Sequence, residues 1–235
     1  INNDIEIKEN KAITIAKVAN PRLAFAKITR HFFQHTKDSY IHETAIIHSS
    51  AVLGEKVTIG PYCVINENVK IGNNTVLESH ILIDMNVNIG EDCYIKTNTT
   101  IGQEGFGVIR DYDNSLIKIP HIGSVVIGNN VEIGSMNTIN RGTIDNTNIQ
   151  DGVKMDDHVH IAHNCSVGKD TVITPGVTLC GSVTIEKESW LGAQCTIIES
   201  TIVREKTIVG IGSVVLRNTE PDSTYIGNPA RKLPK

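Results

Sequence analysis

A dense cluster of ionisable side chains lies at residues 156–164, which read Asp-Asp-His-Val-His-Ile-Ala-His-Asn. Histidine takes up and releases a proton most readily near neutral pH, because its unperturbed pKa is about 6.5. A positioned histidine is therefore a common general base, and a neighbouring carboxylate or carbonyl oxygen can orient its ring. We expect this cluster to carry chemistry, with His163 as its central group.

A six-residue spacing of large aliphatic residues indicates how the cluster is held. Stepping by six through residues 47–101 meets an aliphatic side chain every time, and the pattern returns over residues 127–215 with one four-residue shift. Side chains alternate along a strand, so the residue two before each aliphatic shares its inward face. The repeat predicts a short strand and a corner every six residues, three to a turn, in a triangular parallel β-helix.

Stacking of such coils places residues that are 18 apart in the sequence above one another. Ile161 points inward, so His163, two residues later, should project outward at a corner. One coil on, Gly181 should lie directly over His163, and a further coil places Glu199 in the same column. A glycine at that point predicts an open slot above the imidazole in which a substrate can lie.

Glycine and cysteine occupy regular places in the repeat. The position after the aliphatic is often glycine, as at Gly54, Gly60 and Gly72, and we expect a positive φ there because the corner is sharp. Cysteines lie two residues before an aliphatic and are expected to be buried at Cys63, Cys93, Cys165 and Cys195. Only Cys180 leaves that column. No CxxC spacing occurs, which indicates a reducing compartment such as the cytoplasm.

Composition excludes several classes of protein. The 235 residues carry 22 Lys+Arg against 26 Asp+Glu, a net charge of −4, which argues against a dedicated nucleic-acid or polybasic membrane binder. No apolar run approaches the ~18 residues of a membrane span. We therefore expect a cytoplasmic protein with neither a nucleic-acid partner nor a membrane span.

Three regions are expected along the chain. Residues 1–40 read as a truncated α/β segment that caps the first coil, with strands at 5–7 and 12–15 and a helix that begins at Asn20-Pro21 and runs to about residue 34. Residues 41–217 form the β-helix and residues 218–235 a C-terminal tail. A loop at 103–123 interrupts the repeat, and long loops inside regular structures usually have a function.

The repeat resembles that of the hexapeptide-repeat acyltransferases, which implies a left-handed β-helix. Four further segments resemble the UDP-3-O-acylglucosamine N-acyltransferases of lipid A biosynthesis in order and spacing. They are Gly105-Phe106-Gly107, Lys-Ile-Pro-His-Ile-Gly at 118–123, Thr-Ile-Asn-Arg-Gly at 138–142 with Asp145, and Ile-Ala-His-Asn at 161–164.

The resemblance implies roles for individual residues on the side of the sugar. His163 matches the general base of that family, and Asp156 matches the carboxylate that contacts the amino sugar. The substrate-binding residues that we expect from these segments are Asp156, Asp157, Asn164, Phe106, Asn140, Arg141 and Asp145. Asn140 stands where the family has an aspartate.

On the side of the acyl donor we expect small residues beside a pantetheine arm and basic residues beside phosphates. The expected donor-binding residues are Gly181, Ala193, Glu199, Ser200, Arg217 and Arg231. Ser200 falls where the family has a second histidine. Acyl transfer of this kind needs no metal and no permanently bound cofactor, and a backbone N–H, from Gly181, is expected to stabilise the oxyanion.

The chain departs from the family at both ends. Residues 1–40 resemble only the last part of its uridine-binding domain, and the ending Gly-Asn-Pro-Ala-Arg-Lys is typical of hexapeptide enzymes that use acetyl-CoA. We therefore predict a homotrimer that acetylates a nucleotide-linked amino sugar from acetyl-CoA. The alternative within this class is a lipid A N-acyltransferase that uses a long-chain acyl carrier protein donor.

Two other classes compete with these hypotheses. A zinc enzyme of the carbonic anhydrase type occurs on the same fold and needs three histidines around one metal. His158 and His163 have the required spacing of five residues, but the resemblance makes His163 the first member of such a pair, and the second then falls at Gly168. A binding solenoid without catalysis is the third hypothesis.

Overall fold

The computed structural model describes residues 16–33 and 39–234, in two compact units, Ile1–Asp38 and Ser39–Lys235. The expected strands at 5–7 and 12–15 lie outside the described residues. Helix α1 spans Pro21–Phe33, and Asn20 caps it by accepting a 3.0 Å hydrogen bond from the Leu23 N–H. No side chain of α1 is buried, so its capping role stays a prediction. Neither described range contains a helix with the length and hydropathy needed to cross a membrane.

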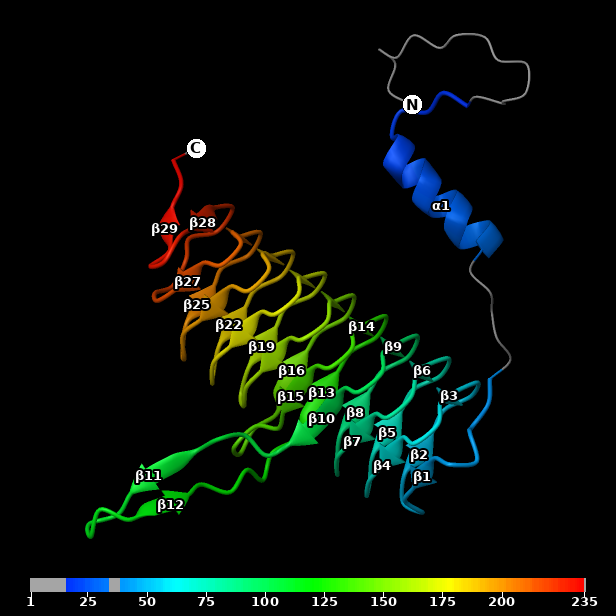
Figure 1. The fold of residues 1–235 in the computed structure, drawn as a ribbon, viewed down its shortest axis with the longest axis horizontal. Helices are drawn as coiled ribbons and strands as arrows, with labels where there is room; N and C mark the ends of the chain where they lie inside the picture. Colours follow the sequence, from blue (N-terminus) through cyan, green and yellow to red (C-terminus); the bar gives the residue numbers. More distant parts are fainter. Residues whose placement is uncertain (1–15, 34–38, 235) are drawn as a thin grey trace. The chain divides into compact units, whose positions relative to one another are not determined.

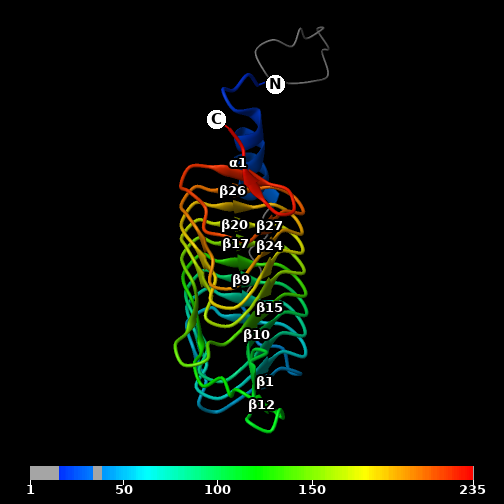
Figure 2. The same cartoon turned by 90° about the vertical axis from the view of Figure 1, so that its left-hand side faces the viewer.

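The second unit is a parallel β-helix of stacked coils, as the six-residue repeat predicts (Figures 1 and 2). Its strands form three sheets, which we call sheets 1, 2 and 3. Sheet 1 contains β1 Ile46–Ile47, β4 Val64–Ile65, β7 Leu82–Ile83, β10 Thr100–Gln103, β15 Thr138–Asn140, β18 His160–Ile161, β21 Thr178–Leu179, β24 Thr196–Ile197 and β27 Val214–Val215. Sheet 2 contains β2 Val52–Leu53, β5 Lys70–Ile71, β8 Asn88–Ile89, β13 Val125–Ile127, β16 Thr147–Ile149, β19 Ser166–Val167, β22 Thr184–Ile185 and β25 Ile202–Val203.

Sheet 3 closes the triangle and extends to the end of the described chain. It contains β3 Thr58–Ile59, β6 Val76–Leu77, β9 Tyr94–Ile95, β14 Glu132–Ile133, β17 Lys154–Met155, β20 Val172–Ile173, β23 Trp190–Leu191, β26 Ile208–Val209, β28 Thr224–Ile226 and β29 Arg231–Lys232. Strand β28 is parallel to β26, and β29 returns antiparallel to β28. Two short segments of the expected C-terminal tail are therefore part of sheet 3.

The aliphatic column forms the core of the β-helix. Its members are buried from Ile59 to Val215, whereas Ile47 and Leu53 in the first coil are only partly buried. Cys63, Cys93, Cys165 and Cys195 are buried beside this column as predicted, and Cys180 is partly exposed. The aliphatic side chains of each coil therefore lie inside the β-helix, and polar residues occupy its corners.

The glycine column has a different cause from the one expected. Positive φ occurs three residues after the aliphatic, as at Asn68 (+57°) and Asn74 (+56°), and the glycines directly after the aliphatic, except Gly102, lack it. A Cβ on Gly72 would lie 2.6 Å from the carbonyl carbon of Gly90 in the next coil. These glycines are therefore required by the close stacking of coils, whereas asparagine tolerates the left-handed corner.

Two insertions leave the β-helix on adjacent coils of sheet 1. After β10 the chain forms an antiparallel hairpin, β11 Val108–Arg110 and β12 Leu116–Lys118, which projects from the coils (Figure 1). After β15 the chain takes a shorter detour before β16. Strands β10 and β15 are paired, and the Arg141 N–H donates to the Gln103 carbonyl at 3.0 Å. Both insertions therefore start at the same corner of the prism.

Candidate functional site

His163 lies at the corner that follows β18, between sheets 1 and 2. Ile161 is fully buried, and His163 is half-buried beyond it. One coil on, a Cβ built on Gly181 would lie 2.6 Å from His163 Cε1 and 2.8 Å from Nε2. Gly181 therefore stacks on the imidazole, as the 18-residue coil predicts. The expected open slot at Gly181 is wrong, because the His163 ring itself fills the space that a side chain there would need.

A hydrogen-bond network determines which nitrogen of His163 carries the proton. His163 Nδ1 lies 3.0 Å from the side-chain oxygen of Asn164. That oxygen also accepts from the Thr143 N–H at 3.1 Å and from the Thr143 hydroxyl at 2.9 Å. Because an amide oxygen only accepts, Nδ1 must donate, and Nε2 keeps its lone pair in the neutral ring. The group that orients the ring is thus an amide, where the sequence suggested a carboxylate or a backbone carbonyl.

A second histidine from the inserted loop lies beside His163. The ring of His121 is 5.1 Å from the ring of His163, centroid to centroid, with an angle of 64° between the planes. His121 is 3% exposed, and its Nδ1 lies 3.0 Å from the Ile119 carbonyl oxygen. Within the described ranges its Nε2 has no hydrogen-bond partner. The place of this side chain beside His163 was not predicted from the sequence, although its position in a long loop inside a regular repeat was a usable signal.

The Gly105-Phe106-Gly107 segment packs against both rings. A Cβ on Gly105 would lie 3.0 Å from His121 Nε2 and 3.0 Å from His163 Cδ2, and one on Gly107 would lie 3.1 Å from His121 Cε1. Side chains at these two positions would displace the histidines. Phe106, which was expected to contact substrate, is 87% exposed.

An ion pair holds the two ends of the loop together near His121. Glu104 pairs with Lys118, and its other oxygen accepts from the His121 N–H at 3.4 Å. The Lys118 ammonium lowers the pKa of Glu104, so this carboxylate stays charged at neutral pH. The start of the loop and the segment before His121 are therefore connected through one side chain.

Arg141 anchors the start of the same loop, next to Glu104. Its guanidinium is 3.1 Å from an Asp84 carboxylate oxygen and donates through Nε to the Gly102 carbonyl. The side chains of this pair are only 7% and 17% exposed. Arg141 was expected to bind substrate; these contacts give it a structural partner on two neighbouring coils.

The two expected sugar-binding carboxylates lie at the preceding corner, between sheets 3 and 1. Asp157 accepts from the Ser135 N–H at 2.7 Å, and Asp156 is exposed and accepts from the Asp157 N–H at 2.8 Å. Among the contacts of the described residues, neither carboxylate touches His163. One chain therefore presents base and carboxylates at different corners.

The other expected site residues are distributed along the coils. Asn140 ends β15 opposite Gln103, and Asp145 is an exposed residue of the second insertion. Glu199 and Arg217 follow Gly181 in its column, and the Ser200 N–H donates to the Gly181 carbonyl at 3.0 Å. Ala193 follows β23 at the corner between sheets 3 and 1, away from Gly181.

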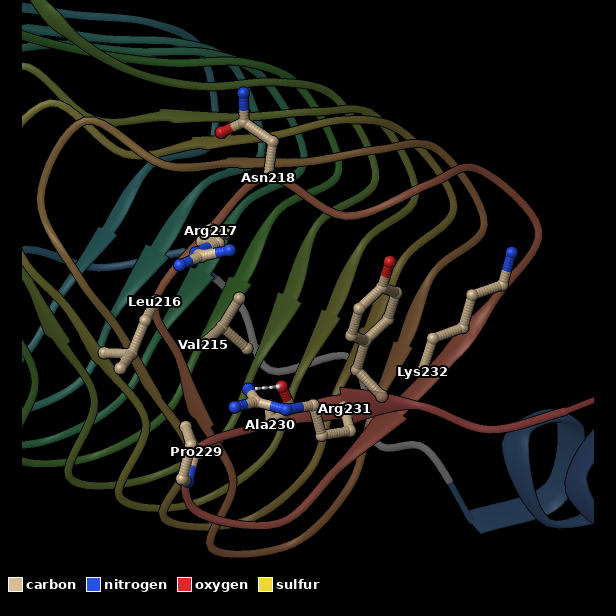
Figure 3. A pocket seen from close by; sticks show the side chains of 9 residues that line it. Val215, Leu216, Arg217, Asn218, Pro229, Ala230, Arg231 and Lys232 are labelled. Atoms are coloured by element: carbon tan, nitrogen blue, oxygen red, sulfur yellow. Dashed lines mark hydrogen bonds between the residues drawn. The ribbon is translucent and has the colours of Figure 1, made fainter.

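A cavity of about 410 Å³ lies at the C-terminal coils. Figure 3 shows the guanidinium groups of Arg217 and Arg231 among the side chains that line it. Arg231 donates to the Ala230 carbonyl at 3.0 Å, and Lys232, also in the lining, pairs with Glu220. The cavity is a basic pocket, and two of the expected donor-binding residues border it.

The cysteines do not provide a nucleophile. Burial raises the pKa of Cys165 and of Cys195 to about 12, so both stay as thiols at neutral pH. No group of three or more His, Cys, Asp or Glu side chains that could hold a metal ion is present in residues 16–33 and 39–234. The ionisable rings that lie next to each other at this corner are those of His121 and His163.

The fold and these segments define a class, that of the hexapeptide-repeat acyltransferases. Residues 38–73 and 50–80 match the family of bacterial transferase hexapeptides with six repeats. The architecture is shared with solved acyltransferases. UDP-N-acetylglucosamine acyltransferase from Francisella novicida superposes with a TM-score of 0.75 at 28% identity, over 83% of this chain and 70% of the other. The corresponding enzyme from Moraxella catarrhalis gives 0.73 at 30% identity, over 82% and 73%. The resemblance to this class is confirmed.

Sequence similarity is more specific than the fold. The chain is 41% identical over 213 residues to the UDP-3-O-acylglucosamine N-acyltransferase of Delftia acidovorans, covering 89% of this chain and 63% of the relative. It is 37% identical over 133 residues to the enzyme of that name from Methylorubrum extorquens, covering 57% and 38%. The chain thus spans less than two thirds of the length of these relatives. Their names favour the lipid A alternative over the acetyl-CoA hypothesis.

Proposed function

We propose that this protein is an N-acyltransferase that moves an acyl group from a thioester to the amine of a UDP-linked, 3-O-acylated glucosamine. The observation that carries the proposal is the arrangement of His163, whose Nδ1 is bound to Asn164 and whose ring is stacked under Gly181. The named relatives supply the substrate class. The relatives support a lipid A N-acyltransferase, the alternative hypothesis, better than the predicted acetyl transfer from acetyl-CoA.

The reaction begins with the amine of the sugar. The sugar amine attacks in its neutral form, so its ammonium form first gives one proton to the solvent. As the neutral amine attacks, His163 Nε2 takes a second proton from the nitrogen. The nitrogen forms a bond to the thioester carbonyl carbon, and the carbon–sulfur bond then breaks. The proton held by His163 passes to the leaving thiolate, so the histidine returns to its neutral form.

Negative charge develops on the thioester oxygen during this attack. In the described part of the chain the Gly181 N–H donates to no other group, whereas the neighbouring Cys180 and Ser182 N–H groups donate to carbonyls. Gly181 is also in contact with the His163 ring. This N–H is therefore the best candidate donor for the oxyanion.

The acyl donor is proposed to be a long acyl chain on acyl carrier protein, as the resemblance implies. Acetyl-CoA remains the second candidate because the C-terminal cavity is bordered by Arg217 and Arg231, whose guanidinium groups suit the phosphates of CoA. Both donors are thioesters and give the same chemistry at His163. Neither requires a metal or a permanent cofactor, and both are used in the cytoplasm.

A homotrimer is proposed because one chain separates the base from the carboxylates. His163 follows β18, whereas Asp156 follows β17 at the previous corner of the prism. Neighbouring prisms that pack side by side can bring these two corners together. Sedimentation is expected to give three times the monomer mass, and a monomer at micromolar concentration would contradict this proposal.

The function is tested by measuring thiol release with UDP-3-O-acylglucosamine and either acyl carrier protein thioester or acetyl-CoA. We expect turnover with the carrier-bound long chain and a decrease of about 10²–10⁴-fold in the His163→Ala variant. The matched control is His48→Ala, which removes an exposed histidine from the first coils. Absence of turnover with every thioester would reject the proposed function, and turnover with acetyl-CoA alone would reject the proposed donor.

A further inference from the structure

We propose that His121 is a positioning residue for the general base, and that its unpaired Nε2 stabilises the His163 ring while that ring holds the proton of the amine. The inference rests on the proposed function for the origin of this proton. It concerns a side chain in the inserted loop that no substrate contact explains. His121 acts through His163 and contacts no reacting atom.

The orientation of His121 is determined by one hydrogen bond. Its Nδ1 lies 3.0 Å from the carbonyl oxygen of Ile119, which can only accept, so Nδ1 carries the hydrogen. Nε2 at the other side of the ring therefore holds a lone pair in the neutral form. This atom is buried, and among the described residues no donor reaches it. The negative end of the imidazole dipole is thus held inside the protein.

Gly105 shows where this lone pair lies relative to His163. The Cβ position of Gly105 is 3.0 Å from His121 Nε2 and 3.0 Å from His163 Cδ2, so both atoms border the same small space. The rings meet edge to face with centroids 5.1 Å apart. A protonated imidazole spreads its positive charge over the ring carbons as well as the nitrogens. The His121 lone pair therefore lies beside positive charge once His163 is protonated.

His163 needs such a neighbour because it lacks a carboxylate partner. In Ser-His-Asp arrangements, an aspartate beside the histidine stabilises the imidazolium that forms during the reaction. Here the Nδ1 partner is the neutral amide of Asn164, and no described carboxylate contacts the ring. Interactions with neutral dipoles are stronger inside a protein than in water. Asn164 and His121 together take the place of the missing carboxylate.

The unpaired Nε2 also weakens the fold, which points to a use outside stability. A buried acceptor without a donor is destabilising, and an apolar ring of the same shape would avoid this loss. The same substitution removes the hydrogen bond from Nδ1 to the Ile119 carbonyl, which opposes this gain. We therefore expect the His121→Phe variant to unfold at a temperature close to that of the wild type. A purely structural histidine would give a clearly lower unfolding temperature.

The first test compares His121→Phe, which keeps a ring without a lone pair, with His121→Gln, whose amide oxygen can replace the acceptor. We expect kcat to fall about tenfold in His121→Phe, as for other partners that orient an active group, with KM for both substrates within twofold. His121→Gln should recover part of this loss. The control His48→Phe should change neither constant. A raised KM with an unchanged kcat would overturn the inference, because it would place His121 in substrate binding.

The second test needs no turnover. Ring-nitrogen NMR on the resting protein follows the pH at which His163 gains its proton. In His121→Phe this pH should fall below the wild-type value, because the protonated ring loses its neighbouring lone pair, and His121→Gln should lie between. The other ionisable groups on neighbouring segments, the Glu104–Lys118 pair, Cys180 and Glu199, are unchanged in these variants. An equal pH in all three proteins would refute the inference, whereas an inactive wild type with the expected shift would refute only the proposed function.

Discussion

Adding one methyl group at Gly181 tests the stacking of this glycine on the general base. In Gly181→Ala the new Cβ would lie 2.6 Å from His163 Cε1 and 2.8 Å from Nε2. The corner itself accepts a side chain, because Lys169, Lys187 and Ala193 occupy the equivalent position of other strands without a positive φ. The perturbation is therefore confined to the imidazole.

The size of the effect follows from these distances. To restore ordinary van der Waals contact the ring must move by about 1 Å, and a displacement of this size costs about 10²-fold in rate when it affects a catalytic group. The movement also strains the 3.0 Å hydrogen bond to Asn164. We expect kcat/KM to fall about 10²-fold while the free energy of unfolding changes by less than about 0.5 kcal/mol.

The matched control is Gly212→Ala, which places the same methyl group where nothing lies within 4 Å. Gly212 has a φ of +63°, so alanine there costs about 1 kcal/mol of stability through backbone strain. Gly181→Ala should lose thioester turnover and keep its stability in urea, whereas Gly212→Ala should keep turnover and lose stability. A Gly181→Ala protein with turnover within twofold of the wild type would refute the assignment of His163 as the base.

Three further outcomes are expected. Asn164→Gly suits the φ of +60° at that corner and removes the acceptor of His163 and of both Thr143 donors. We expect kcat to fall about tenfold and the free energy of unfolding to fall by about 1 kcal/mol. Kinetics and urea unfolding would measure this, and an unchanged kcat would contradict it. Arg141→Met should lower the free energy of unfolding by about 3 kcal/mol, because the largely buried Asp84 carboxylate loses its charged partner and keeps only the Asn66 and Met85 donors. A pure increase in KM would instead favour substrate binding. In the folded protein a thiol reagent at pH 8 should modify Cys180 first. Burial raises the pKa of all five thiols, for Cys165 and Cys195 to about 12, but Cys180 is partly exposed and the other four are buried. Equal rates at all five, followed by mass spectrometry, would contradict the buried column.

The six-residue period was sufficient to predict the β-helix. In a strand of two residues the aliphatic side chain points inward, because its burial is favourable. A constant period then pairs residues 18 apart through backbone hydrogen bonds. The column of His163, Gly181 and Glu199 therefore follows from counting. The helix start at Asn20-Pro21 was equally local, because the cap and the proline act on the first turn itself.

The reason for the glycines could not be deduced from the repeat alone. The sequence suggested a positive φ at the glycine itself, but the structure has the positive φ two residues after it. Glycine is needed because the backbone of the next coil lies too close to leave room for a Cβ. Both explanations predict glycine at the same positions. Only the distance between neighbouring coils distinguishes them.

The sequence by itself determined the repeat, the core and the column that carries His163, because each depends on residues at a constant separation. Only the tertiary structure decided what surrounds the imidazole. His121 reaches it from a loop without a period, held by the Ile119 carbonyl and by the Glu104–Lys118 pair. Contacts of this kind depend on how irregular segments pack against the coils, and that packing is a property of the whole fold.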